Sequence, residues 1–278
     1  MGTENQGNME WQISFRKIIT MKINSQYKHS QELHEFIKSL PKNFEREGEI
    51  LYDERNVIKS FMVRTHEKYT EKVVVKRYKC PNIIQQIIYS FFRKSKAERA
   101  FSYGIQLQEA SINTPTPIAY FEEWKNGLFK FGYYLSGYDN APAIRKELIE
   151  KEEFNQTMAE DFAIFVANLH NKDILHHDLN STNVLYHPEA NGHYSFSVID
   201  INRMTFKKSK LTLSECLDNL TRFTGRMDLF EYVLKKYIQY RGLPLQKTLQ
   251  EGIAIKIKHD RDWYRRKNFF KKIKSFIK

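Results

Sequence analysis

The sequence predicts an α+β fold of two lobes, in which a small antiparallel β lobe precedes a larger, mainly helical lobe. Over residues 48–78, short β-branched runs alternate with polar turns, a pattern typical of antiparallel strands. Over residues 154–170 and 214–241, apolar residues recur at helical spacing. A short polar connection that contains Gly137 and Pro142 separates the two parts. It would suit a joint between lobes.

Five strands are expected in the small lobe. Residues 57–63 place apolar side chains at alternating positions, and residues 73–76 form a β-branched run that ends in Lys76. With residues 50–52, these segments predict an antiparallel meander. Two more strands follow a helical stretch, at residues 118–121 and 128–135.

Two helices are expected within the same lobe. In residues 83–92, Ile and Phe recur at helical spacing; packing in the core of the lobe is the favoured role, and membrane contact is the alternative. Ser95 is expected to cap the second helix, with Glu98 at its third position as in a capping box. The TPTP segment at residues 114–117 should end that helix.

The chain divides into four predicted parts. In the larger lobe, a loop and two short strands, at residues 183–186 and 196–199, lie between the two long helical stretches. The expected organisation is an N-terminal extension (1–44), a β-rich, nucleotide-covering lobe (45–137), a helical lobe with the catalytic loop (138–252) and a basic amphipathic tail (253–278).

Composition limits the class of protein. The 278 residues are 41% hydrophobic, which allows a packed core and excludes disorder as the main state. Two cysteines predict no disulfide framework and no zinc site, and favour a reducing compartment. No apolar run approaches the roughly 18 residues that cross a bilayer, and the polar N-terminus is unlike a secretory signal. A cytoplasmic location is expected.

The net charge of +12 calls for an anionic partner or substrate. Nucleic acid is not expected, because there is no zinc-finger spacing, RNP-like stretch or obvious recognition helix. Residues 255–278 predict a basic amphipathic helix with Phe269, Phe270, Ile273, Phe276 and Ile277 on one face. Such a helix can lie on an anionic bilayer or dock on the domain by the same face.

The strongest local signal is the segment HHDLNSTN at residues 176–183. It matches H-x-D-L-x-x-x-N, the catalytic loop of kinases. Asp178 would accept the proton of the attacking hydroxyl or orient it, and Asn183 would turn back to hold a Mg²⁺ ion that bridges the phosphates of ATP. His176 is expected to support the backbone of this loop.

Two further residues complete the predicted site. Asp200 follows a buried strand seventeen residues after Asn183 and is the expected second Mg²⁺ ligand. Lys76 ends a β-branched run and is suited to grip the α- and β-phosphates. Glu98 is the expected partner of Lys76, with Glu109 as a weaker candidate.

These motifs together resemble the lipopolysaccharide core kinase family, which includes Kdo kinases and heptose kinases and has a protein-kinase-like fold. The likeness covers roughly residues 45–240. It rests on RN (55–56), VVKRY (74–78), SKAERA (95–100), TPTPIA (114–119), HHDLNSTNVL (176–185) and IDINR (199–203).

The resemblance implies phosphorylation of an inner-core sugar on a lipid A-linked saccharide, with ATP and Mg²⁺, at the cytoplasmic face of the inner membrane. Asp178 would then serve the sugar hydroxyl. The chain departs from ordinary protein kinases, because it lacks G-x-G-x-x-G before Val57, D-F-G at Asp200 and A-P-E. Phosphate cover is therefore expected from Arg55, Asn56 and backbone amides.

Two other readings remain open on the sequence. One is a small-molecule kinase of the aminoglycoside or choline type, which would share the catalytic loop but would not need the basic tail. The other is a basic kinase-like binding protein without catalysis. An inactive relative would normally lose Lys76, Asp178 or Asp200, and this chain keeps all three.

Overall fold

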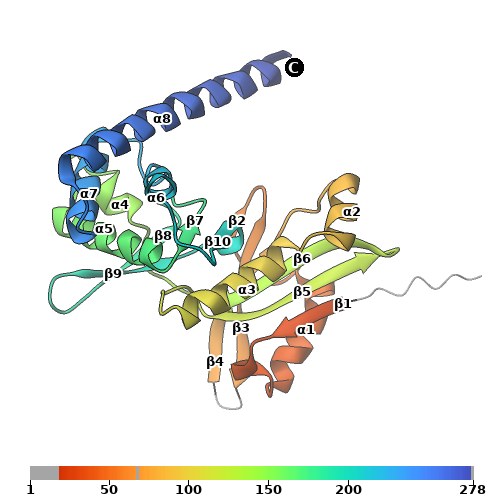
Figure 1. Ribbon diagram of the computed structural model, residues 1–278. Helices are drawn as coiled ribbons and strands as arrows, with labels where there is room; N and C mark the ends of the chain where they lie inside the picture. The colour runs from red at the N-terminus through yellow and green to blue at the C-terminus, as the bar shows by residue number, and fades with distance from the viewer. Residues whose placement is uncertain (1–18, 67–68, 277–278) are drawn as a thin grey trace, which may run out of the picture.

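The computed structural model describes residues 19–66 and 69–276 and has two lobes (Figure 1). A six-stranded antiparallel sheet with its helices forms the smaller lobe, and helices dominate the larger one. The chain passes from one to the other after Gly137, the last residue of strand β6 (Leu128–Gly137). This arrangement confirms the predicted α+β class and the predicted order of the lobes.

The strands of the small lobe lie in the order β1-β5-β6-β4-β3-β2, and all neighbouring pairs are antiparallel. The predicted meander is the β2-β3-β4 part of this sheet. Lys76 lies on β4, opposite Ile58 of β3 and Tyr134 of β6, so strands fix its backbone on both sides. The other strands are β1 (Ile19–Ile23), β2 (Glu49–Asp53), β3 (Val57–His66), β4 (Tyr69–Arg77) and β5 (Pro117–Lys125).

Residues 19–44 are part of the small lobe. Strand β1 pairs with β5 at the edge of the sheet. After a short 3-10 turn (Ser25–Tyr27), helix α1 (Gln31–Asn43) starts at Ser30, whose Oγ accepts a hydrogen bond from the N–H of Leu33 at 3.1 Å. The apolar face of α1 is fully buried against the sheet. The sequence predicted residues 1–44 as an extension, whereas their described part forms an edge strand and part of the core.

Helices α1 and α3 (Lys96–Glu109) cover opposite faces of the sheet (Figure 1). Because successive strand residues point to opposite faces, Tyr133 of β6 packs in the core beside α1, and Tyr134 packs in the core beside α3. Ser95 caps α3 as predicted, since its Oγ accepts from the N–H of Glu98 at 3.1 Å. Helix α3 also contacts the segment Ile201–Arg203 of the larger lobe, so it ties the sheet to that lobe.

Helix α2 (Ile83–Phe91) buries none of its residues. The prediction that it packs in the core of the small lobe was wrong. Its contacts with β6 come from polar positions: the hydroxyl of Ser90 accepts from the N–H of Phe129 at 2.9 Å. Periodicity predicted the helix correctly but could not tell which face would point inward.

The larger lobe is built around helices α5 and α7, which pack against each other. The helix predicted over residues 214–241 is in fact two helices, because residues 221–226 between them are not helical. Two short strand pairs, β7 with β10 and β8 with β9, carry the loops of the site. The elements are α4 (Arg145–Leu148), α5 (Gln156–Asn171), β7 (Ile174–His176), β8 (Val184–Pro188), β9 (Tyr194–Val198), η2 (Ile201–Arg203), β10 (Met204–Phe206), α6 (Leu213–Leu220) and α7 (Met227–Tyr240).

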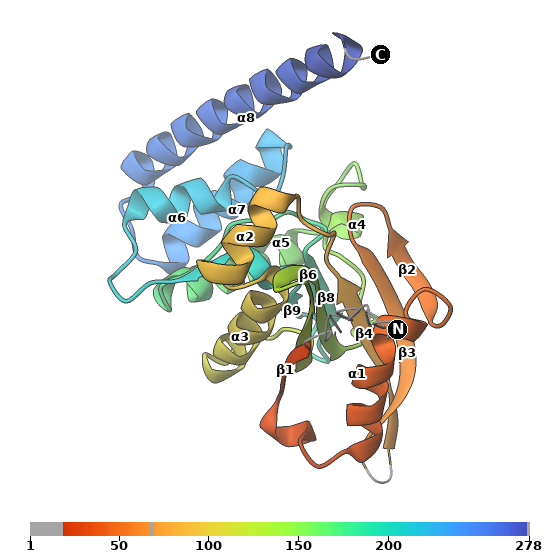
Figure 2. The same ribbon diagram turned by 90° about the vertical axis from the view of Figure 1, so that its right-hand side faces the viewer.

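The chain ends in one long helix, α8 (Leu245–Phe276), which packs on α6 and α7 only at its beginning (Figure 2). Gly252 allows this close approach, because a Cβ atom there would lie 2.6 Å from Leu234. The side chain of Lys256 is buried, and its Nζ donates to the carbonyls of Thr221 and Thr224 at 3.2 and 2.6 Å. The first part of α8 is thus docked on the larger lobe, through residues that precede the predicted amphipathic face.

The rest of α8 runs clear of the body of the protein (Figures 1 and 2). Trp263, Tyr264 and Phe269 are exposed there. The remaining apolar residues of the predicted amphipathic face, Phe270, Ile273, Phe276 and Ile277, have side chains outside the described part of the structure. Among the described residues, no helix combines the length and the apolar character needed to span a membrane.

Lys256→Ala should destabilise the protein by about 3 kcal/mol, because it leaves two buried carbonyls and Asp260, 2.7 Å from Nζ, without their donor. Urea unfolding measures this change. Lys258→Ala, an exposed position on the same helix, is the matched control and should change stability by less than about 0.5 kcal/mol. Equal effects of the two substitutions would show that Lys256 does not anchor α8.

Candidate active site

The loop after β7 carries Asp178 and is held by His176. His176, the last residue of β7, is fully buried. Its Nδ1 accepts from the N–H of Asp178 at 3.2 Å, and its Nε2 donates to the carbonyl of Ile199 at 3.0 Å. Burial lowers the pKa of His176, which favours the neutral ring that this pair of bonds requires. His176 thus joins the catalytic-type loop to the strand that leads to Asp200.

Asp178 is half-buried. Its Oδ1 accepts from Nδ2 of Asn180 at 3.1 Å. Asn183 closes the loop, because its Nδ2 donates to the carbonyl of Asp178 at 2.9 Å. This bond leaves the Oδ1 atom of Asn183 as an acceptor for a ligand.

Asp200 lies directly after the β8-β9 pair, in the left-handed backbone region at φ 55°. Its Oδ1 accepts from Nζ of Lys76 at 2.5 Å and from Nδ2 of Asn202 at 2.7 Å. Burial is the largest single influence and raises the pKa of Asp200, but the charge and the hydrogen bond of Lys76, together with nearby groups that include Arg203, outweigh it, and the net pKa lies below its ordinary value. The carboxylate is therefore ionised at neutral pH, as a metal ligand must be.

A cavity of about 480 Å³ opens between the lobes beside this pair. Lys76, Asn183 and Asp200 line it, as does the acidic residue Asp139, and its remaining walls are largely apolar, from both lobes. A cleft that is apolar on its walls and charged at one end suits a ligand with a flat ring system and a chain of phosphates. Asn56, from the β2-β3 turn, also lines it.

Of the seven predicted site residues, four come together at one cleft, two lie elsewhere, and Asp178 lies on the catalytic-type loop without lining the cleft. Lys76 meets Asp200 across 124 residues of chain, and Asn183 and Asn56 line the same cavity. Glu98 instead forms an ion pair with Lys94 at 2.9 Å, and no ion pair between Glu98 and Lys76 exists among the described residues. Arg55 lines a second, neighbouring cavity instead.

Sequence reasoning missed Tyr78 and Asn202. The ring of Tyr78 is 5.3 Å from Nζ of Lys76 and buried, and the amide of Asn202 holds Asp200. The signal for Tyr78 was present, since residues two apart on a strand share a face. Asn202 carried no separate signal, because its contact depends on the left-handed turn at Asp200.

The oxygen donors fit a magnesium ion better than a softer metal. Asp200 offers a carboxylate and Asn183 an amide oxygen in one cleft, and Mg²⁺ commonly takes one or two protein oxygens, with water and phosphates completing its shell. No group of three or more His, Cys, Asp or Glu side chains within the described ranges could hold a metal. The donor set is therefore one that phosphates would have to complete.

A buried hydrogen-bond chain supports the loop from below. Nδ2 of Asn219 donates to the carbonyl of His176 at 2.9 Å, and its Oδ1 accepts from Nε2 of His170 at 3.1 Å. The other ring nitrogen of His170 lies 2.8 Å from the hydroxyl of Tyr237. Burial lowers the pKa of His170 to about 4. The chain therefore depends on a neutral His170.

This histidine should make the protein less stable in mild acid. Since the pKa of His170 is about 4 in the fold and about 6.5 in the unfolded chain, the unfolded state binds more protons between these values, and stability falls as pH falls. From pH 7 to pH 5 the expected loss is about 2 kcal/mol. Urea unfolding of wild type and His170→Gln at both values isolates this contribution. If both proteins lose the same stability, His170 is not its source.

Comparisons with known proteins indicate the family of the chain. A sequence profile described as the lipopolysaccharide kinase (Kdo/WaaP) family matches residues 43–231. A solved structure titled "WaaP in complex with acyl carrier protein" is 14% identical, with a TM-score of 0.57 over 88% of this chain and 98% of that one. A search of curated proteins found no match.

The structural likeness supports the kinase-like fold alone, whereas the family match spans more than half of the chain and includes Lys76, Asp178, Asn183 and Asp200. It confirms the resemblance that the motifs had indicated. The chain belongs to the lipopolysaccharide kinase (Kdo/WaaP) family.

Proposed function

We propose that the protein transfers the γ-phosphate of ATP to a sugar hydroxyl, of Kdo or of heptose, in the inner core of a lipid A-linked saccharide. One observation carries the proposal: Lys76 of the small lobe pairs at 2.5 Å with Asp200 of the larger lobe, at the end of a cleft that Asn183 also lines. A lysine from one lobe and metal-type oxygens from the other are the parts that phosphoryl transfer needs.

Each residue has a proposed role. When ATP binds, Nζ of Lys76 would donate to the α- and β-phosphates as well as to Asp200. Asn56, in the β2-β3 turn, would cover these phosphates in place of a glycine-rich loop. Asn183 and Asp200 would hold Mg²⁺, which when bound neutralises charge on the phosphates. The carboxylate of Asp178 would orient the sugar hydroxyl and accept its proton.

We also propose that the protein works as a peripheral protein on the cytoplasmic face of the inner membrane. The net charge of +12 supports this location, as does the exposed second part of α8, which is rich in Lys and Arg and carries Trp263 and Tyr264. Each basic residue close to an anionic surface contributes about 1 kcal/mol to binding. A lipid-anchored acceptor would then be within reach of the cleft.

The test is incubation with ATP, Mg²⁺ and a Kdo-bearing lipid A precursor, followed by mass spectrometry of the acceptor. The proposal predicts the gain of a phosphate on the saccharide. Heptose-bearing acceptor, an aminoglycoside and choline should be run in parallel. Phosphorylation of a soluble alcohol alone would contradict the proposed acceptor but keep the kinase, and no transfer to any of them would contradict the kinase itself.

A further inference from the structure

Helix α2 turns its polar face toward the protein and its apolar face toward solvent, the reverse of an ordinary surface helix. Its half-buried residues are the polar and amphipathic ones, Gln86, Tyr89 and Ser90. Nε2 of Gln86 donates to the carbonyl of Pro81 at 3.0 Å, and Tyr89 packs on Phe129 with ring centroids 5.6 Å apart. A helix of a globular protein normally turns its apolar stripe inward. Here the contacts with the protein use the opposite side.

The apolar side of α2 and the residue that follows it are exposed to solvent. The exposed fractions range from 40% to 81%, and Phe91 and Phe92 are at 68% and 81%. Arg93 and Lys94 come next and are also exposed. Contiguous exposed apolar surface of this kind marks an interaction site. Its members are Ile83, Ile84, Ile87, Ile88, Phe91 and Phe92.

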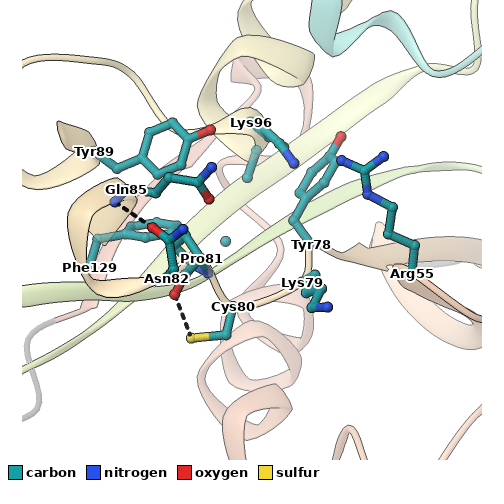
Figure 3. A pocket seen from close by; sticks show the side chains of 12 residues that line it. Arg55, Tyr78, Lys79, Cys80, Pro81, Asn82, Gln85, Tyr89, Lys96 and Phe129 are labelled. Atoms are coloured by element: carbon teal, nitrogen blue, oxygen red, sulfur yellow. Dashed lines mark hydrogen bonds between the residues drawn. The ribbon is translucent and has the colours of Figure 1, made fainter. Parts of the chain in front are cut away.

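A basic cavity of about 280 Å³ lies directly against α2 (Figure 3). Three cations line it: Arg55 from the β2-β3 turn, Lys79 from the linker before α2, and Lys96 from the first turn of α3. The lining contains no Asp or Glu, and none of these cations forms an ion pair with a described residue. Burial and then the nearby positive charges of Arg55, Arg203 and Arg99 lower the pKa of Lys96, and Asp200 offsets them only in part, as expected where positive charges outnumber negative ones.

The cavity lies beside the catalytic-type site. Tyr78 lines it and is also in contact with Lys76 at 5.3 Å. Arg55 lines the cavity and the next residue, Asn56, lines the nucleotide-type cleft. An anionic group in the cavity would therefore be held next to the phosphate end of that cleft.

We propose that α2 inserts its apolar face into an anionic bilayer, and that the basic cavity beneath it takes the phosphate group of a membrane lipid. The two features fit one arrangement at a bilayer. The apolar side chains on the outer side of the helix would enter the acyl region, and the cations on its inner side would stay at the depth of the headgroups. A protein docked in this way would meet its lipid-anchored acceptor at the bilayer surface. This consequence rests on the proposed function.

A bilayer fits this surface better than a second copy of the chain. A second copy would bring Arg93, Lys94 and the same basic cavity against themselves, in a protein whose net charge is +12, and like charges at an interface oppose association. An anionic membrane complements both features. In addition, α8 leaves the larger lobe and runs over toward the side of the molecule that carries α2 (Figures 1 and 2), so a second basic element extends to that side.

Vesicle flotation of the full chain without ATP or acceptor tests the insertion. We expect binding to vesicles of phosphatidylcholine with phosphatidylglycerol, and at least tenfold weaker binding for Ile84→Ser/Phe91→Ser, because two exposed apolar side chains lose their burial in lipid. Met62→Ser/Tyr69→Ser is the matched control, since both residues are similarly exposed outside α2, and it should bind as wild type does. Equal binding by the α2 variant would overturn the proposal.

The cavity is tested with Lys79→Gln/Lys96→Gln. This variant should lose roughly tenfold in affinity for anionic vesicles, with little change on phosphatidylcholine alone. Lys38→Gln/Lys42→Gln removes the same charge from α1 as a control and should have a smaller effect. If both pairs of substitutions weaken vesicle binding equally, the cavity acts only through the general surface charge, and its proposed role is overturned. A stable dimer that the α2 variant disrupts, with no vesicle binding by wild type, would assign α2 to a second copy instead.

Activity separates this proposal from the proposed function. The α2 serine variant should phosphorylate detergent-dispersed acceptor at the wild-type rate and vesicle-borne acceptor at least tenfold more slowly. An equal rate on vesicles would overturn the role of α2. Vesicle binding without phosphate transfer in either format would overturn the proposed function and leave the membrane-docking surface standing.

Discussion

Replacing Asp178 by Asn is expected to lower the rate of phosphate transfer by about a thousandfold, while the affinity for ATP changes by less than about threefold. An amide cannot accept the proton of the attacking hydroxyl, and such a proton transfer is typically worth 10²–10⁴ in rate. Asp178 does not line the nucleotide-type cavity. The loss should therefore be in kcat, with KM for ATP nearly unchanged.

The fold should tolerate this substitution. The backbone N–H of Asp178 donates to the ring of His176, and its backbone carbonyl accepts from the amide of Asn183. Neither bond uses the side chain of Asp178, so both survive the substitution. Asp262→Asn, on α8 away from the site, is the matched control and should keep full activity. Wild-type turnover by Asp178→Asn would remove Asp178 from the reaction. An equal loss of ATP affinity would move its role to nucleotide binding.

Asp200→Ala is expected to abolish magnesium-dependent transfer, to below about a thousandth of the wild-type rate. The substitution removes the proposed carboxylate ligand, and it also leaves Lys76 without the charge that lies 2.5 Å from it. Raising the Mg²⁺ concentration should not restore the rate, because the ligand itself is missing. Restoration by high Mg²⁺ would show that Asp200 assists metal binding without being required.

The same variant makes a separable prediction on stability. The side chain of Lys76 is only 13% exposed, so loss of its partner should destabilise the protein by about 2 kcal/mol or more. The double variant Lys76→Met/Asp200→Ala should recover most of that loss, since no unpaired charge remains, and should still be inactive. If the double variant is no more stable than Asp200→Ala, the pair is not coupled in the way the structure indicates.

Much of the fold follows from local patterns. The strands around Lys76 and the helices α3, α5 and α7 coincide with alternation and helical periodicity in the sequence. The features that the sequence did not predict depend on which helix face or strand edge packs against which part of the sheet. Strand β1 does alternate, as Ile-Thr-Met-Lys-Ile, but its pairing partner β5 is far away in the sequence, so a local pattern could not show that it joins the sheet. Helix α1 is recognisable as part of the core only once its apolar face has a sheet to cover. The orientation of α2 reverses the general rule on amphipathic helices.

The site was predictable where it depends on motif spacing, and not where it depends on contacts. The loop from His176 to Asn183 and the strand before Asp200 fix where those residues lie, and Lys76 follows from the strand it ends. Glu98 failed as the partner of Lys76 because it lies in the first turn of α3, where Lys94 is close enough to pair with it. The sequence places Glu98 in the first turn of α3 but does not show whether its side chain points toward Lys76 or toward Lys94.

The central claim is that a triphosphate binds where the two lobes meet, between Lys76 and Asp200. A crystal structure of the protein with Mg²⁺ and a non-hydrolysable ATP analogue tests it most directly. We expect the base in the cleft of about 480 Å³, the phosphates beside Lys76, and one Mg²⁺ ion that both Asn183 and Asp200 ligate. A nucleotide bound elsewhere, or one bound in the cleft with its phosphates turned away from Lys76 and Asp200, would contradict the account.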